Sequence, residues 1–285
     1  MGICKMCRSD PLEEKEERMF VIGERLNGMF LDVRKGIQTK DKSIIQKVAL
    51  DQVKAGANAL DINVGPASDK PLEVMVWLVE AVQEVTSITL SIDTPKFDVM
   101  KAAMQVCKNP ILMNSTKGEE AKLDKYMPLA KEYNASIIGL TINEKGIPKT
   151  VDARVETAAL IAAKAMEFGI DMDKLYIDPI VMPANVAQDQ APIVLEAIKQ
   201  FAYLSSPPPH IVVGLSNLGQ GAKERELLTR IWLSMAVMNG LDAAIMDAAD
   251  KEMRDAFITA ELLMNKAIYS DSYIRAYDAS HNHID

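Results

Sequence analysis

The sequence is poor in histidine, and this absence excludes several kinds of active site. Its 285 residues include three histidines, His210, His281 and His283. Two of them lie in the polar tail, and His210 begins an apolar run, where a parallel barrel would place it away from the site. A Ser-His-Asp hydrolase is therefore disfavoured, and a barrel hydrolase built on clustered histidine metal ligands is excluded.

The three cysteines do not point to a metal site either. Cys4 and Cys7 form a C-x-x-C pair in a polar leader, and Cys107 stands alone. A structural zinc site needs more ligands than one such pair supplies, and a redox C-x-x-C needs a βα context that the leader lacks. We interpret the pair as thiols of a polar extension over residues 1–18, and we predict no metal site. This use of cysteine fits a reducing cytoplasm.

Long apolar runs, a phosphate-binding loop and an excess of basic residues are absent as well. No apolar run is long enough to cross a membrane, and the N-terminus lacks the apolar core of a signal peptide. No G-x-x-x-x-G-K-[ST] string occurs, and the net charge of −8 does not favour binding to nucleic acid. The composition, 48% hydrophobic and 25% charged, is that of an ordinary soluble globular protein, so we expect a cytoplasmic location.

What the sequence has instead is a short apolar run that recurs eight times, each closed by a polar residue. The closing residues are Glu24, Asp61, Asp93, Asn114, Asn143, Asp178, Asn217 and Asp247. The seven steps between them average about 32 residues, which is the size of one βα unit. Runs that are apolar throughout are typical of strands buried on both faces, as in a parallel sheet. We therefore predict an α/β fold, a single (β/α)8 TIM barrel over residues 19–285, after the extension 1–18.

Between the runs lie stretches with the periodicity of amphipathic helices. The clearest are residues 71–85, 152–168 and 224–239, and Gly169 has the position of a glycine that ends a helix. The last stretch carries one apolar stripe, made of Leu227, Leu228, Ile231, Met235 and Met238. We expect such stripes, which hold most of the 17 methionines, to fill the core.

In a TIM barrel the site lies at the carboxyl ends of the strands, which here carry carboxylates, amides and hydroxyls. These residues are Glu24, Asn27, Asp61, Asn63, Asp93, Asn114, Ser115, Asn143, Asp178, Ser216, Asn217 and Gln220. A carboxylate accepts from two neighbouring N–H groups and an amide both donates and accepts, so the set suits a flat, nitrogen-rich ring such as a pterin. A single aspartate at such a place can equally cap the next helix, and loops are polar in general.

Six short motifs follow one another in barrel order and point to a known family. They are G-E-R-L-N-G-M-F (23–30), D-I-N-V-G-P (61–66), M-N-S-T (113–116), Y-I-D-P (176–179), P-A-N-V-A-Q-D (183–189) and G-L-S-N (214–217). Together they resemble the pterin-binding methyltransferases, most of all methyltetrahydrofolate:corrinoid/iron–sulfur protein methyltransferase. The resemblance covers about residues 19–275 and implies a dihydropteroate-synthase-like barrel.

The resemblance also implies roles for individual residues. Asp93, Asn114 and Asp178 match the residues that bind the pterin, and Asn217 matches the one that approaches N5 of the folate. The remaining implied folate-binding residues are Asp61, Asn63, Asn185, Gly214, Ser216 and Gln220, of which Asn185 is placed near the folate tail. The implied catalytic groups are Asn217 and Asp93, which would help N5 gain a hydrogen bond or proton as the methyl group leaves.

The implied reaction moves a methyl group between N5 of tetrahydrofolate and the cobalt of a corrinoid, in either direction. The sequence has no D-x-H-x-x-G string for holding a corrinoid, so a partner protein should carry it. The resemblance further implies a homodimer. Two alternatives stay open: a dihydropteroate synthase-like pterin enzyme, for which a K-x-R-x-H-like string near the eighth strand is missing, and a non-catalytic folate-binding subunit. Transfer to homocysteine is rejected because the cysteines supply no zinc site.

Overall fold

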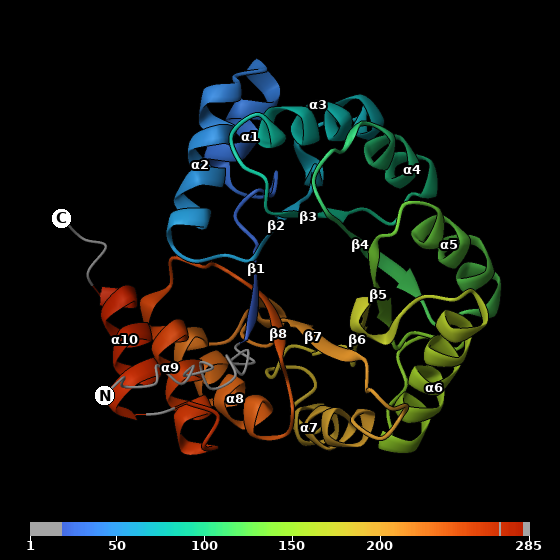
Figure 1. The fold of residues 1–285 in the computed structure, drawn as a ribbon, viewed down its shortest axis with the longest axis vertical. Helices are drawn as coiled ribbons and strands as arrows, with labels where there is room; N and C mark the ends of the chain where they lie inside the picture. The colour runs from blue at the N-terminus through green and yellow to red at the C-terminus, as the bar shows by residue number, and fades with distance from the viewer. Residues whose placement is uncertain (1–18, 268, 282–285) are drawn as a thin grey trace, which may run out of the picture.

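The computed structural model describes residues 19–267 and 269–281, and there the chain forms a closed barrel of eight parallel strands in sequence order. The strands are β1 (Phe20–Gly23), β2 (Ala59–Ile62), β3 (Thr89–Asp93), β4 (Ile111–Lys117), β5 (Ser136–Leu140), β6 (Leu175–Asp178), β7 (His210–Gly214) and β8 (Ala243–Met246). Figure 1 looks into the ring of strands, with the helices arranged around it. The predicted eight-stranded barrel is confirmed.

The helices that surround the barrel begin where the sequence offers caps. They are α1 (Leu31–Thr39), α2 (Lys42–Lys54), α3 (Pro71–Gln83), α4 (Phe97–Val106), α5 (Glu120–Glu132), α6 (Val151–Glu167), α7 (Gln190–Phe201), α8 (Arg225–Met238), α9 (Lys251–Leu263) and α10 (Ile274–His281). The side chains of Asp41, Thr150 and Asp250 accept the free backbone N–H groups that begin α2, α6 and α9. Gly169, with φ of +68°, follows the end of α6 as predicted.

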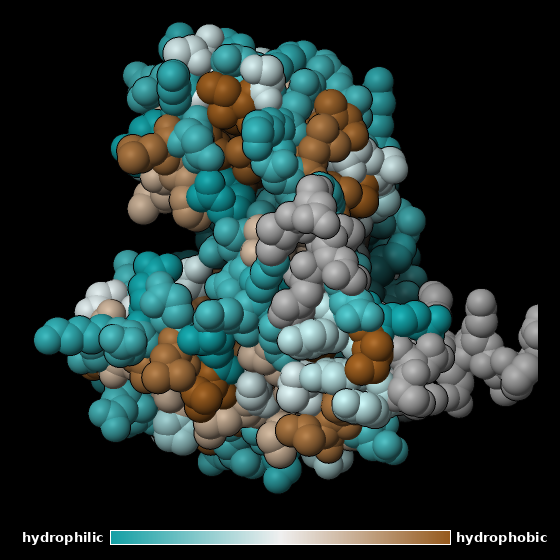
Figure 2. All heavy atoms as spheres, turned by 90° about the vertical axis from the view of Figure 1, so that its left-hand side faces the viewer, coloured by the Kyte–Doolittle hydropathy of each residue, from teal (hydrophilic) through white to brown (hydrophobic). Residues whose placement is uncertain are grey.

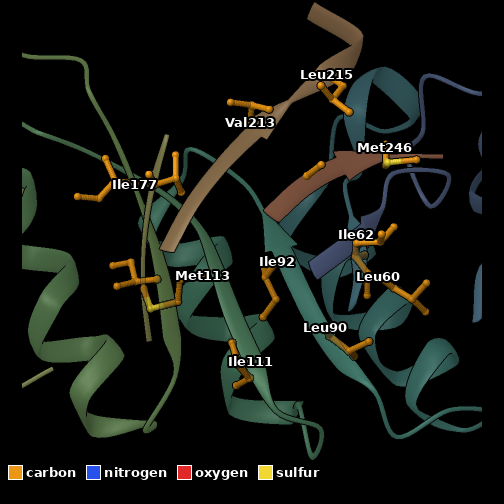
Figure 3. Close-up of a cluster of buried hydrophobic side chains, with 14 of the residues drawn as sticks. Leu60, Ile62, Leu90, Ile92, Ile111, Met113, Ile177, Val213, Leu215 and Met246 are labelled. Carbon is orange, nitrogen blue, oxygen red and sulfur yellow. The ribbon is translucent and has the colours of Figure 1, made fainter. Parts of the chain in front are cut away.

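Alternation along each strand divides its side chains between two apolar layers. Residues that point outward, such as Leu60, Ile92 and Met113, pack under the helices (Figure 3). Residues that point inward form a second cluster inside the barrel, with Ile22, Ala59, Leu112, Ile138, Tyr176, Val212 and Ala243 as its buried members. Because side chains alternate with a period of two, the residue two positions beyond each inward apolar residue also faces the barrel axis.

The first and last strands pair to close the barrel, and a buried glutamine forms hydrogen bonds at this junction. β1 pairs with β8 through the register Ile22 to Ile245. Gln52 of α2 donates to the Asp247 carboxylate at 2.6 Å and accepts from the backbone N–H of Ala248 at 3.1 Å. Gly23 leaves room for it, since a Cβ there would lie 2.7 Å from the Gln52 amide oxygen.

The prediction for the apolar stripe of residues 224–239 was wrong. The helix exists as α8, but Leu227, Ile231, Met235 and Met238 are 50%, 58%, 46% and 63% exposed, and Leu228 is 41% exposed. α8 packs on the barrel through another face, which carries the buried Trp232, Leu233 and Ala236. Both faces of this helix are therefore apolar, and periodicity alone did not tell which one faces the barrel. On the side of the molecule seen in Figure 2, apolar residues lie in separate patches on a largely hydrophilic surface.

Other expectations differ from the structure in detail or fall outside it. β6 ends at Asp178, the residue predicted to close its run, although residues 180–181 are apolar again: Pro179 has no N–H for the sheet and Ile180 has a φ of +62°. The extension 1–18, with Cys4 and Cys7, lies outside the described residues. In the part of the chain that is described, no helix has both the length and the apolar composition of a membrane span.

Candidate functional site

The carboxyl end of the barrel interior is lined by polar side chains, because the alternation that turns apolar residues inward lower in the strands turns these residues inward as well. Asp61 follows Ala59, Asn114 follows Leu112, and Asp178 follows Tyr176. Strand register then sets them side by side: Asp61 pairs with Ser91, and Asp93 pairs with Asn114. Residues more than a hundred positions apart thus meet in one polar layer above the apolar interior, which we call the floor: Asp61, Ser91, Asp93, Asn114 and Asp178.

Asp61 is the centre of a hydrogen-bonded group in this floor. Its Oδ1 accepts from the Ser91 hydroxyl at 2.6 Å and from the Asn114 amide at 3.0 Å. Asp61 and Asn114 are both buried, with 3% and 8% of their surfaces exposed. Burial is the largest influence on Asp61 and raises its pKa, although the two hydrogen bonds oppose the shift. The Asn114 carboxamide keeps its oxygen free of these bonds and can accept from a ligand.

Asp93 ends β3, and its carboxyl group lies close enough to Asp61 for the two charges to interact. Burial raises the pKa of Asp93, the negative charge of Asp61 raises it further, and a hydrogen bond from the Asn63 amide lowers it. Asn63 is itself held in place, since its Oδ1 accepts from the backbone N–H of Gly65 at 2.6 Å. Two neighbouring carboxyls in such an environment hold protons more readily than free aspartates do, so the pair can serve as donor and acceptor.

Asp178 lies across the barrel from this pair, at the end of β6. Its Oδ1 accepts from the backbone N–H of Ile180 at 2.7 Å, which leaves the second oxygen free of recorded bonds. Burial raises the pKa of Asp178 to about 7, against the effects of the Ile180 N–H and the nearby Arg154 guanidinium. Near neutral pH this carboxyl therefore exists in both its charged and its neutral form.

Arg154 of α6 fixes the backbone that carries Asp178. Its side chain is fully buried and donates to the carbonyl oxygens of Pro179 and Ile180 and, at 3.0 Å, to the amide oxygen of Gln190. These bonds hold Ile180, a non-glycine residue at positive φ, in its unusual conformation. Sequence reasoning missed Arg154, although a cation on the apolar face of a predicted helix was a signal that could have revealed it.

The loop after β7 completes the mouth of the barrel. The short helical turn Leu215–Asn217 follows Gly214 directly, and it exposes Ser216 and Asn217. A Cβ on Gly214 would lie 3.1 Å from Nδ2 of Asn217, so the missing side chain makes room for that carboxamide. The Ser216 hydroxyl donates to both carboxylate oxygens of Glu24, at 2.8 and 2.9 Å. Gln220 is exposed in the same loop.

The structure does not bring every predicted site residue to the floor. Asn185 is exposed in the loop after β6 and lines a groove of about 750 Å³ against α8, together with Leu218 and Lys223. His210 lies at the opposite, amino end of its strand, as predicted, with Nδ1 2.7 Å from an Asp242 oxygen. Within residues 19–267 and 269–281, no cluster of histidine, cysteine and acidic side chains is suited to hold a metal ion.

A second cavity at the mouth, of about 200 Å³, lies between the ends of β1, β7 and β8. Barrels often bind phosphate in this region. The cavity wall holds four carboxyl groups, Glu24, Glu226, Asp247 and Asp250, against the two arginines Arg25 and Arg225. Both arginines have acidic partners, since Arg25 lies 2.9 Å from Asp32 and Arg225 3.3 Å from Glu226. A site with this charge balance does not favour a diphosphate.

The geometry therefore offers a largely buried floor of carboxyl and amide groups that can hydrogen-bond the edge of a flat polar ring. Comparison with known proteins agrees with this chemistry. Residues 30–247 match the model of the pterin binding enzymes. The chain belongs to the pterin-binding enzyme family. The match includes every residue of the floor and the loop that carries Asn217.

Individual members of the family narrow the comparison. Methylcorrinoid:tetrahydrofolate methyltransferase of Eubacterium limosum is 31% identical over 264 residues, which are 91% of this chain and 96% of that protein. Methionine synthase of Mycobacterium leprae (strain TN) is 27% identical over 243 residues, 81% of this chain but 20% of that protein. The chain thus spans nearly the whole of the first relative and about one fifth of the second.

Solved structures show the same fold at lower identity. Dihydropteroate synthase from Thermus thermophilus, in complex with 6HMPPP, has a TM-score of 0.63 at 18% identity and covers 87% of this chain and 95% of its own. A Yersinia pestis DHPS with a pterine-sulfa conjugate has the same TM-score and identity, and covers 88% and 95%. These likenesses confirm the predicted dihydropteroate-synthase-like barrel and concern the fold alone.

Proposed function

We propose that this protein is a methyltransferase that moves a methyl group between N5 of tetrahydrofolate and the cobalt of a corrinoid carried by a partner protein. The observation that carries the proposal is the buried floor of Asp61, Ser91, Asp93, Asn114 and Asp178 at the mouth of a barrel of the pterin-binding family. The relative that the chain covers almost end to end, at 31% identity, acts on a methylcorrinoid and tetrahydrofolate by its name.

In this proposal the floor binds the pterin and orients it. The pterin edge presents neighbouring N–H donors, for which the free oxygen of Asp178 and the Asn114 carboxamide are suitable partners. Asp93, held by Asn63, would contact the ring from beside Asn114, across the barrel from Asp178. Residues on rigid strand ends position a ring more accurately than loop residues do, and good positioning lowers the barrier to transfer.

The reaction also needs a donor for N5, because a tertiary amine is a poor leaving group unless it gains a proton or a strong hydrogen bond. Asn217 is exposed at the mouth, and among the described residues no hydrogen bond engages its carboxamide. A donor whose bond strengthens in the transition state speeds the reaction. The raised pKa of the Asp93 carboxyl makes it a second proton source for a water near N5.

The alternative of a dihydropteroate synthase finds no support in the second cavity at the mouth. That reaction releases a diphosphate, which calls for unpaired basic groups. Here the cavity is rich in carboxyl groups and both of its arginines have acidic partners. The likeness to solved dihydropteroate synthases, at 18% identity, concerns the fold.

A direct test follows methyl transfer under anaerobic conditions in both directions. Methyltetrahydrofolate is mixed with cob(I)alamin, and separately tetrahydrofolate with methylcobalamin, and the corrinoid spectrum is recorded by stopped flow. The proposal expects protein-dependent conversion in at least one direction, and the ratio of rates identifies the direction that the protein favours. Folate binding without conversion, even with an added corrinoid protein, would support the non-catalytic subunit instead.

The affinity for tetrahydrofolate should rise with pH through neutrality. The pKa of Asp178 is raised to about 7, and the charged carboxylate accepts from two N–H groups better than the neutral acid does. If the ligand binds the form in which Asp178 is ionised, its apparent affinity falls by up to about tenfold for each pH unit below 7. Above pH 7 the affinity levels off. Calorimetric titrations from pH 5.5 to 8.5 measure this slope, and Asp178→Asn should flatten it. An equal slope in that variant would assign the effect to another group.

We further propose that the protein forms a homodimer through α8. Its exposed stripe of Leu227, Ile231, Met235 and Met238 follows one face of the helix and borders the 750 Å³ groove beside residues 184–191. A two-fold interface uses the same patch on both subunits, so a long apolar stripe can pack against its own copy. Exposed apolar patches of this kind mark interfaces, and the family resemblance implies a dimer.

A charge in the middle of the stripe should dissociate the dimer. Ile231→Glu places a carboxylate where the second copy of α8 would bury it, which costs more than a stable interface tolerates. Light scattering after size exclusion should give the dimer mass for the wild type and the 31.4 kDa chain mass for the variant. Leu50→Glu, on α2 and 46% exposed, is the matched control and should remain dimeric. A monomeric wild type would contradict the proposal.

A further inference from the structure

Glu24 is a carboxyl group of the barrel mouth to which the proposed pterin binding assigns no role. It follows β1 and lies two residues beyond the inward-facing Ile22, so it faces the barrel axis. Its two oxygens accept from the hydroxyl of Ser216, which is 192 residues away in the sequence. Ser216 belongs to the turn Leu215–Asn217 that also carries Asn217.

This contact is a strong one for a serine hydroxyl. Glu24 is only partly exposed, and burial is the main cause that raises its pKa. The charged groups that face Glu24 are Asp61 from β2, Asp247 after β8 and Arg225 from α8. The two aspartates raise the pKa of Glu24 further, and Arg225 lowers it. No ion pair is recorded for Glu24 in the described ranges, so the hydroxyl of Ser216 is its main stabilising partner. Hydrogen bonds to charged acceptors are stronger than those between neutral groups.

Both ends of the turn are held by burial, since Leu215 is 1% and Leu218 3% exposed. Its middle, Ser216 and Asn217, is exposed, and the contact with Glu24 is the one side-chain hydrogen bond that holds it among the described residues. The Asn217 carboxamide has no recorded hydrogen bond to the described residues, so its direction is set by the backbone to which Ser216 is tied. Gly214 beside it has no side chain that could support the carboxamide.

We propose that Glu24 is a positioning residue, which holds the Leu215–Asn217 turn through Ser216 and thereby sets the rate of methyl transfer without adding to pterin affinity. The inference rests on the proposed function. Glu24 and Ser216 then share one role. Loss of either side chain should slow methyl transfer as much as loss of both. The floor residues that bind the ring belong to β2, β3, β4 and β6, and neither partner touches them in a recorded hydrogen bond.

The test compares Glu24→Met, which has no oxygen to accept from Ser216, with Ser216→Ala, the double variant and Ser216→Thr, which keeps the hydroxyl. Single-turnover transfer should slow roughly tenfold in each of the first two variants and by the same factor in the double variant, since coupled partners are not additive. Ser216→Thr should stay near the wild-type rate. The dissociation constant for tetrahydrofolate should stay within about twofold throughout. Glu226→Gln, on the wall of the same cavity and paired with Arg225, is the control and should behave as wild type.

Hydrogen exchange of residues 214–221 gives a second measure that does not need activity. It should become faster in Glu24→Met and Ser216→Ala and stay unchanged in Glu226→Gln. Three results would overturn this inference and leave the proposed function standing. They are wild-type rates and exchange in both single variants, a multiplied loss in the double variant, and a loss of folate affinity that parallels the loss of rate. A wild type that binds folate and transfers no methyl group would overturn the proposed function, and with it the role assigned to Glu24.

Discussion

Replacing Asn217 by alanine should slow methyl transfer by about 10²–10³, which corresponds to a loss of about 2.7–4 kcal/mol of transition-state stabilisation. Asn217 is the exposed carboxamide at the end of the Leu215–Asn217 turn, and no recorded bond to the described residues competes for its amide. A donor to N5 matters most as the methyl group leaves. The variant should therefore lose rate and keep most of its affinity for tetrahydrofolate.

Stopped-flow transfer under single-turnover conditions measures this rate, and calorimetry measures the affinity separately. Gln220→Ala is the comparison variant, because Gln220 is an exposed amide of the same loop with no side-chain hydrogen bond in the described structure, and its predicted part in folate binding would affect the affinity and not the transfer step. It should reduce the rate far less. A wild-type rate in Asn217→Ala would remove Asn217 from the role of donor, and equal losses in both variants would indicate general damage to the loop.

Replacing Arg154 by methionine should lower the free energy of unfolding by about 3–5 kcal/mol, as the loss of one partner in a buried polar network does. The guanidinium is fully buried and serves the carbonyls of Pro179 and Ile180 and the amide oxygen of Gln190. Methionine fills the space and leaves these oxygens without a donor. It also removes the positive charge that favours ionised Asp178, so the pKa of Asp178 should rise further.

Urea unfolding followed by circular dichroism measures the change in stability. Lys101→Met removes a positive charge from the exposed surface of α4 and is the control, with an expected change within about 0.5 kcal/mol. Folate affinity should also fall in Arg154→Met and not in the control, because the backbone that carries Asp178 loses its support. Stability equal to the wild type would show that the buried guanidinium is not needed for the conformation of residues 179–180.

Much of this architecture could be predicted, because the dominant signals are local. A parallel strand buried on both faces reads as a short apolar run, and the polar residue that closes it marks the mouth of the barrel. Asp61, Asp93, Asn114 and Asp178 were predicted as strand-end residues, and the structure brings all four together in the floor. Their roles as pterin ligands came from the family resemblance and are still predictions.

What the sequence did not show depends on contacts between distant residues. The hydrogen bond between Glu24 and Ser216 joins the loops after β1 and β7, which are 192 residues apart in the sequence. Nothing in the local sequence around either residue indicates that they meet. Arg154 was hidden in an amphipathic helical stretch whose buried face is otherwise made mostly of alanine and isoleucine. The stripe of α8 was assigned to the core because periodicity shows that a helix has an apolar face and does not show what covers it.

The central claim is that the floor binds a pterin ring, and titration calorimetry with tetrahydrofolate tests it most directly. At pH 8 the wild type should bind one equivalent per chain. Asp178→Asn and Asn114→Ala should each bind roughly 10–100-fold more weakly, through the loss of about one strong hydrogen bond. Circular dichroism should show that both variants are folded. No heat of binding to the wild type, or wild-type affinity in both variants, would contradict the account.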